Sequence, residues 1–138
     1  MLETIRLICD SGLLILIWMV QLVIYPSFSY YKQEDLFKWH ETYTKRIAVI
    51  VIPLMLGQLI TSSIQIYTNL DFYTITSSLL VFGVWLSTFL LFVPLHTNLS
   101  KREEVELSIK KLKLHNWLRT ILWSLIFIVT FYLKFRTL

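Results

Sequence analysis

Charged residues are almost absent from four long stretches of the chain. These stretches are residues 11–31, 47–70, 72–100 and, with Arg119 as its one charge, 114–133. Runs of about 18 or more apolar residues are long enough to cross the hydrocarbon core of a bilayer as helices. The pattern therefore predicts one domain over residues 1–138 with four spans. The predicted spans are about 5–26, 46–67, 75–97 and 115–134.

The composition agrees with this pattern and excludes several classes of protein. The 138 residues are 56% hydrophobic and 16% charged, whereas soluble domains have about 25% charged residues. We expect an all-α integral membrane protein, an antiparallel four-helix bundle in contact with the lipid bilayer. The long apolar runs exclude a soluble enzyme and a nucleic-acid partner. A disulfide scaffold is excluded because Cys9 is the single cysteine. The first run is too long for a signal peptide and is interpreted as a retained helix.

The basic residues lie mainly on one side of the predicted bundle. Ten of the 13 fall in or beside the first and third connections, and the other three belong to the terminal segments. Cytoplasmic loops of membrane proteins carry an excess of Lys and Arg. The asymmetry predicts a multi-pass protein of a bacterial-type inner (plasma) membrane, with both long connections in the cytoplasm and both termini outside.

The connections also show local signals. Pro26 is expected to end the first helix, because proline lacks an amide donor and clashes with the preceding turn. Glu34–Thr44 combines polar and aromatic residues and predicts a cytoplasmic interfacial helix continuous with span two. Ser100–Lys113 predicts an amphipathic helix with Ser100 as N-cap and Glu103 completing a capping box.

All three histidines, His40, His96 and His115, fall at the predicted cytoplasmic face. Histidine titrates near neutral pH, binds metals and serves as an acid or base, so the cluster is a candidate site. Interfacial anchoring of the helices is the alternative. At the opposite face, Asp10 and Asp71 are expected to be isolated, with no charge deep in the bilayer.

Helical spacing places further polar and aromatic residues on inward faces. Asp10, Trp18 and Tyr25 share one face of span one, with Gln21 beside them in the same stripe. Such stripes predict either an aromatic-walled cavity with a polar cytoplasmic end or simple hydrogen bonds between helices, worth about 0.6 kcal/mol each. The candidate substrate-binding residues are Trp18, Gln21, Tyr25, Arg46, Trp85, Phe92 and Trp123.

Two arginines lie near the predicted membrane boundary. Arg46 and Arg119 can each extend to phosphate headgroups, as long basic side chains at helix ends do. Alternatively they bind an anionic or enolate-like group of a ligand, for which the guanidinium offers a fork of donors. Both interpretations remain open from the residues alone.

Several segments resemble the anthrone-oxygenase-like family of small four-helix membrane proteins. They are VIYPSF at the end of span one, WHETYTKRIAVIVIPLM in span two, and VPLHTNLS followed by LHNWLRTILWSL across spans three and four. Members of that family show a proline and asparagine break after span three and a Trp/His…Arg-Thr motif opening span four. The matching residues are Pro94, His96, Asn98, His115, Asn116, Trp117, Arg119 and Thr120.

The resemblance implies an oxygenase-like oxidoreductase acting on an apolar aromatic or isoprenoid substrate. By this resemblance, His115 or His40 would remove a proton from an activated C–H bond, and Arg119 and Asn116 would stabilise the resulting oxyanion. Characterised members are similar to oxygenases that convert polycyclic anthrones to quinones without an obvious cofactor.

Non-enzymatic alternatives stay open. YTKRIAVIVIPLM is more distantly similar to haem-associated bundles of the protoporphyrinogen-oxidase and copper-resistance type, which carry a histidine in span one where this chain has Asp10 and Ser11. A module that binds haem, lipid or a metal held by His40, His96 and His115 is one such alternative. A small-molecule transporter, which at this size requires a homo-oligomer, is another. The cofactor is therefore unknown: none, haem or a metal.

Overall fold

The computed structural model describes residues 1–136, with side chains through Tyr132, and those residues form helices and short turns without a strand. Four helical segments are long and apolar enough to cross a membrane. They are Leu2–Tyr30, Gln33–Thr68, Phe72–Ser100 and Val105–Tyr132. The predicted all-α, four-helix architecture is confirmed: the first three segments extend beyond the predicted spans at both ends, and the fourth begins ten residues before its predicted start.

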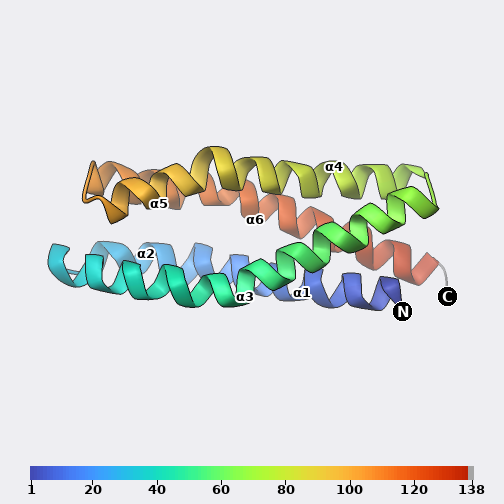
Figure 1. Cartoon of the computed structure of the whole chain (residues 1–138), viewed down its shortest axis with the longest axis horizontal. Coiled ribbons are helices and arrows are strands. Elements are labelled where there is room, and N and C mark those ends of the chain that lie inside the picture. The colour runs from blue at the N-terminus through green and yellow to red at the C-terminus, as the bar shows by residue number, and fades with distance from the viewer. Residues whose placement is uncertain (137–138) are drawn as a thin grey trace.

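The four segments alternate in direction around the bundle. Helix α1 packs against α3 and α6, and α4 packs against the same two neighbours. Figure 1 shows the first residue and the end of α6 at one end of the bundle, and at the other the turn between α2 (Tyr25–Ser27) and α3 and the turn between α5 and α6. The main helices are α1 (Leu2–Met19), α3 (Gln33–Thr68), α4 (Phe72–Ser87), α5 (Val93–Ser100) and α6 (Val105–Arg136).

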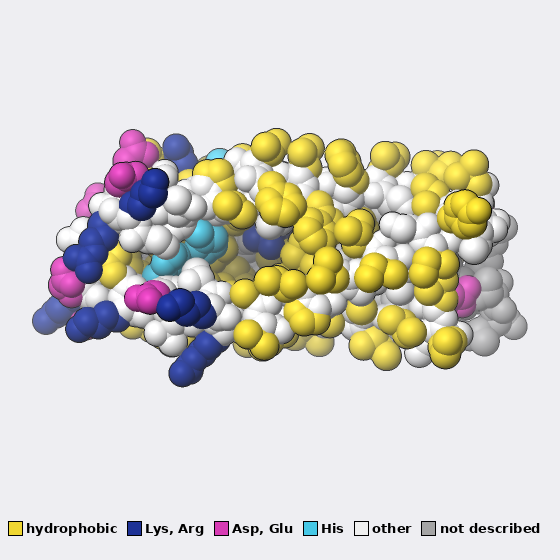
Figure 2. Space-filling model, viewed as in Figure 1, with side chains coloured by type: hydrophobic (Ala, Val, Ile, Leu, Met, Phe, Trp, Pro, Cys, Tyr) yellow, Lys and Arg dark blue, Asp and Glu magenta, His cyan; other side chains and the backbone are white. Residues whose placement is uncertain are grey.

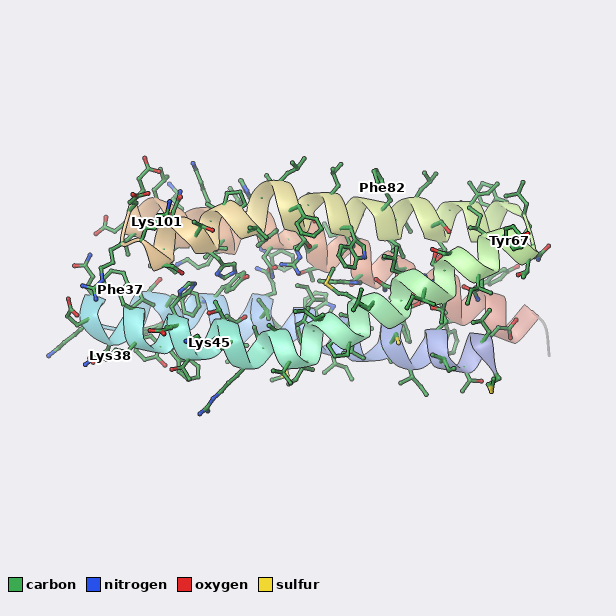
Figure 3. The ribbon with its side chains drawn as sticks, viewed as in Figure 1. Phe37, Lys38, Lys45, Tyr67, Phe82 and Lys101 are labelled. Atoms are coloured by element: carbon green, nitrogen blue, oxygen red, sulfur yellow. The ribbon has the colours of Figure 1, made fainter. Side chains whose placement is uncertain are left out.

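The outer surface has the character that a bilayer requires. Large apolar side chains point outward over much of its length, as Val49 (74% exposed) and Phe82 (64% exposed) do, and Figure 3 shows Phe82 projecting from α4. Lys, Arg, Asp and Glu gather at the end that carries the α2–α3 and α5–α6 turns (Figure 2). This charged end is where both basic connections of the sequence lie.

Pro26 does not end the first helix as expected. A π-helical turn, η1 (Val20–Ile24), precedes it, and α2 (Tyr25–Ser27) carries the chain through the proline into the 3-10 turn η2 (Phe28–Tyr30). Span three repeats the arrangement, because the π-helical turn η3 (Thr88–Phe92) ends two residues before Pro94. A π turn moves the backbone hydrogen bonds from i→i+4 to i→i+5 pairs and widens the helix. Each helix thereby accommodates the N–H that proline lacks and continues through it.

The capping box predicted at Ser100 is wrong. Ser100 is the last residue of α5, and α6 begins only at Val105. The Glu103 amide donates to the Asn98 carbonyl (2.9 Å) and the Arg102 amide to the Leu99 carbonyl (3.2 Å). With Arg102 at φ 62°, these bonds form a Schellman motif, which closes a helix C-terminus. The segment therefore ends one helix where the sequence predicted the start of another.

The helix predicted over Glu34–Thr44 is confirmed as the first part of α3, which continues without a break to Thr68. At its far end the chain turns sharply into α4. Asp71 caps α4 by accepting from the Thr74 amide (2.8 Å), while the Asp71 amide donates to the Thr74 hydroxyl (3.0 Å). This reciprocal capping box fixes the short turn between spans two and three.

A buried ion pair lies toward the end of the bundle opposite the charged end. Arg6 and Asp10 are both fully buried, and the Arg6 Nε donates to Asp10 Oδ2 at 2.7 Å. The same guanidinium also donates to Gln65 Oε1 (3.3 Å) and to the Ser77 hydroxyl (2.6 Å). Arg6 therefore links spans one, two and three.

The Asp10 carboxylate completes this polar network. It accepts hydrogen bonds from the Gln58 amide (2.6 Å) and the Thr130 hydroxyl (2.6 Å), which brings in span four. The expectation that Asp10 is isolated and that no charge lies deep in the bundle is therefore wrong. A buried pair with its remaining donors and acceptors satisfied fixes the relative positions of the helices, since any slip leaves a charge unpaired.

Candidate functional site

A cavity of about 800 Å³ opens between α3 and the η3–α5 segment, with α1 and α6 behind it. Its inner wall is apolar and comes from residues such as Ile17, Val20 and Met55. Phe89 and Val93 line its edge and are 58% and 48% exposed on the apolar surface. The hollow visible in Figure 2 shows histidine side chains on its wall and a basic side chain in its depth. The opening therefore lies on the apolar outer surface of the bundle.

The two π-helical turns shape this cavity. Val20 begins η1, and Thr88, Phe89 and Phe92 belong to η3, and all four line the space. A π turn widens a helix locally and rotates the residues that follow it. The π turns before Pro26 and Pro94 therefore affect the site, because they set the direction of Tyr25 and His96. Tyr25 directly follows η1, and His96 lies in α5, the helix that follows η3.

Three side chains from three spans form a hydrogen-bonded chain at the polar end of the cavity. The Tyr25 hydroxyl lies 3.0 Å from His96 Nε2, and His96 Nδ1 lies 2.9 Å from His40 Nε2. The two imidazole rings stack with centroids 5.2 Å apart. Tyr25 and His96 line the cavity, whereas His40 is 1% exposed and lies behind His96. We call Tyr25, His96 and His40 the relay.

The hydrogens of the relay can point in either of two directions, because the donor and acceptor roles of the ring nitrogens depend on the tautomer. Each imidazole nitrogen that donates must face an atom that accepts, so the hydrogens along the three groups all point the same way. With Tyr25 donating to His96 and His96 donating to His40, the Tyr25 oxygen keeps free lone pairs. A proton added at Tyr25 can then be passed on to His40 by moving each hydrogen to the next heavy atom. The relay thus connects the cavity wall at Tyr25 to His40 behind it.

Arg119 is the buried cation of the cavity. It is 9% exposed, and its guanidinium carbon lies 4.3 Å from the Phe92 ring centroid and 4.9 Å from that of Trp123. Its Nε is buried with no hydrogen-bond partner. No aspartate or glutamate lines the cavity among the described residues. The charge is thus held between aromatic faces, an arrangement that stabilises a guanidinium, without a carboxylate beside it.

The structure brings together five of the residues singled out from the sequence. These cavity-lining residues are Tyr25, Trp85, Phe92, His96 and Arg119. Two more lie directly behind them: His40 in the relay and Trp123 against the guanidinium. The Trp85 Nε1 is buried without a partner, so it is a free donor at the cavity wall. The Trp123 Nε1 instead donates to Gln58 Oε1 at 3.3 Å.

His115 and Asn116 do not join this group. Neither lines the cavity, and the buried Nδ1 of His115 has no hydrogen-bond partner. Asn116 donates to Gln21 Oε1 at 2.9 Å, and the Thr120 hydroxyl donates to the same oxygen at 3.3 Å. Gln21 and Asn116 therefore form a hydrogen-bonded contact between spans one and four, behind the cavity.

Trp18 and Arg46 lie outside the cavity as well. Trp18 is 38% exposed, donates to the Ser124 hydroxyl at 3.2 Å and meets Trp117 edge to face. Arg46 is exposed and borders a separate shallow depression on α3. The neighbouring Lys45 pairs with Glu41 at 2.7 Å. Arg46 therefore retains only the surface interpretation.

Tyr43 and Thr88 are wall residues that the sequence analysis did not select. Both line the cavity, and Tyr43 packs edge to face on Phe28. Tyr43 lies three residues after His40, so helical spacing already placed the two on one face. Thr88 carries a comparable signal, because it lies three residues after Trp85 and four before Phe92.

Among the described residues, no three His, Cys, Asp or Glu side chains converge in a way that could hold a metal. His40 and His96 bond to each other through ring nitrogens that a metal would need. His115 is not part of their cluster. The metal site formed by all three histidines is therefore not present in this arrangement of the side chains.

Fold and site together define a four-helix bundle of membrane type with a laterally open cavity and a relay of proton-carrying side chains. Comparisons of the chain with protein-family models, with curated proteins and with solved structures give no match. The function has to be argued from the cavity itself.

Proposed function

We propose that the chain is a membrane-embedded, oxygenase-like oxidoreductase that takes an apolar aromatic or isoprenoid substrate from the bilayer into the cavity. The observation that carries the proposal is the relay at the polar end of an otherwise apolar, laterally open space of about 800 Å³. Ligand pockets of about 300–1,000 Å³ with apolar walls and a few convergent polar groups are typical of small-molecule sites.

The proposed first step is proton removal from a C–H bond made acidic by a neighbouring carbonyl. The substrate proton goes to the Tyr25 oxygen, the Tyr25 proton to His96 Nε2, and the His96 Nδ1 proton to His40 Nε2. The products are a substrate enolate and a His40 imidazolium, so charge and protons balance. The enolate then reduces dioxygen, the oxidant: a ring CH₂ becomes C=O with one oxygen atom, and the other oxygen leaves as water with both hydrogens.

The orientation belongs to the same proposal. We place the charged end, with both long basic connections, in the cytoplasm and both termini outside a bacterial-type plasma membrane. The relay then lies near the cytoplasmic face, with His40 buried behind His96. A reporter that is active only in the cytoplasm, fused to the C-terminal residue, is expected to give no signal; activity there would reverse the orientation.

Blocking the cavity tests the proposed site. Ala48 lines the cavity. The Ala48→Trp substitution is expected to fill the cavity and to weaken the binding of anthrone by about tenfold or more, which corresponds to about 1.4 kcal/mol of binding free energy. The measurement is anthrone retained per protein in lipid nanodiscs, corrected for empty nanodiscs.

The matched control is the adjacent Val49→Trp, because Val49 is 74% exposed to the surrounding lipid and does not line the cavity. Val49→Trp should bind anthrone as the unaltered chain does. Equal retention by Ala48→Trp and Val49→Trp would place the ligand elsewhere and reject the site.

A further inference from the structure

Arg119 is a buried cation without an acidic partner, and this is the point from which the ligand's chemistry can be inferred. Arg119 is only 9% exposed. The described residues form three ion pairs, and none includes Arg119. Burying an unpaired charge is costly. By contrast, Arg6, which is also buried, has Asp10 within 2.7 Å.

The surroundings of Arg119 offset only part of that cost. The Phe92 and Trp123 rings lie at 4.3 and 4.9 Å from the guanidinium carbon. Such contacts are worth about 2 kcal/mol when desolvated, well below the several kcal/mol that an ion loses on leaving water. The oxygens that interact with the guanidinium are the Tyr25 and Tyr43 hydroxyls, which carry no formal charge when protonated. The cavity therefore lacks an anion.

The cavity also contains a second cation, in a different setting. Lys101 lines it near its mouth, is exposed, and extends from the α5–α6 turn at the charged end (Figure 3). Water and counter-ions can screen this ammonium group. Arg119, in the depth of the same space, has the uncharged Tyr25 and Tyr43 hydroxyls and whatever enters the cavity.

We infer that the cavity binds its ligand as an anion: an amphipathic acid, with a carboxylate, phenolate or enolate oxygen on Arg119 and an apolar body against Ile17, Val20 and Met55. The inference rests on the proposed function in taking an apolar ligand to fill the cavity. A guanidinium suits this task because its fork of donors can hold two oxygens of one acid group. The relay, which lines the same space, lies beside the acidic oxygen and can take its proton on binding.

Matched acidic and neutral probes test this with the full chain in nanodiscs. Anthracene-9-carboxylate and 9-methylanthracene share a ring system and differ in charge; palmitate and hexadecanol are the corresponding acyl pair. At least one acid should bind about tenfold or more tightly than its neutral analogue, as expected for a charge pair formed in a buried site. Binding of one acid and not the other identifies the body, aromatic or acyl, that the walls accept.

Variants of the two cations assign the effect. Arg119→Gln, and also Arg119→Lys, should lower the affinity for the preferred acid by about tenfold or more, because neither side chain provides the charged fork. Both should leave binding of the neutral probe unchanged, which also shows that they fold. Lys101→Gln should alter the affinity for the acid by less than about threefold, since exposed charges are screened.

The outcomes separate this inference from the function it rests on. Equal binding of acids and neutral analogues overturns the anion inference and leaves the apolar site standing. Loss of acid binding in Lys101→Gln but not in Arg119→Gln moves the anion to the mouth and also overturns it. Failure of all four probes to bind rejects the proposed site itself.

Discussion

Replacing Asp10 with alanine is expected to be the most destabilising single substitution in the bundle. The carboxylate is fully buried, pairs with Arg6 at 2.7 Å, and accepts from Gln58 and Thr130 at 2.6 Å each. Asp10→Ala leaves the Arg6 guanidinium buried and uncompensated, and breaking a buried pair in this way costs about 3–5 kcal/mol. The measurement is the free energy of unfolding in detergent micelles.

Two controls show whether the cost comes from the unpaired charge. The double variant Arg6→Leu/Asp10→Leu removes both charges and should lose less stability than Asp10→Ala, since an apolar pair of similar volume often replaces a buried ion pair without penalty. Glu41→Ala removes an exposed i,i+4 pair with Lys45 and should have no measurable effect. A double variant less stable than Asp10→Ala contradicts the explanation.

His96→Gln is expected to have the largest effect on chemistry. It breaks the relay between Tyr25 and His40 while keeping a polar side chain at the cavity wall, because glutamine does not pass a proton on under these conditions. General acid–base catalysis contributes about 10²–10⁴-fold, and we expect a loss of that order. The measurement is the rate of hydrogen–deuterium exchange at the acidic CH₂ of anthrone in D₂O, which reports proton removal without requiring the oxidant.

His115→Gln is the matched control for this prediction. His115 is also a histidine near the charged end, but it does not line the cavity or contact the relay. The rate of anthrone exchange with the His115→Gln variant should equal the rate with the unaltered chain. Should His115→Gln lose the exchange and His96→Gln retain it, His115 is the base, one of the two that the family resemblance implies, and the relay is not the catalytic group. A cavity that only binds lipid leaves both rates at the uncatalysed value.

The architecture was predictable because it depends on long-range averages of the sequence. Charge-free runs give the number of helices, and the continuous pattern over Glu34–Thr68 gives the length of α3. Local stops were not predictable. Proline commonly ends a helix in a soluble protein, yet here the residues before Pro26 adopt a π turn and the helix continues; a helix that crosses a bilayer has no water to satisfy the backbone groups that a break would expose.

The candidate site was predictable in part. Helical spacing placed Tyr25, Phe92 and Arg119 inward, and all three line the cavity. It could not separate His96 from His115, because both lie at the charged end and only the rotation of each helix decides which imidazole meets His40. The network around Asp10 was missed for a related reason: its partners Gln58 and Thr130 lie 48 and 120 residues away, and no local pattern links them.

Photoaffinity labelling tests most directly whether the lateral cavity is a ligand site. The probe is an anthracene bearing a diazirine, irradiated with the full chain in nanodiscs, and the adducts are located by peptide mass spectrometry. The account predicts adducts within 47–55 of α3 and 88–97 of η3 and α5, the cavity-facing segments, and their loss when excess unmodified anthracene competes. Adducts spread over outward residues such as Leu22 and Ile121, unaffected by the competitor, would contradict it.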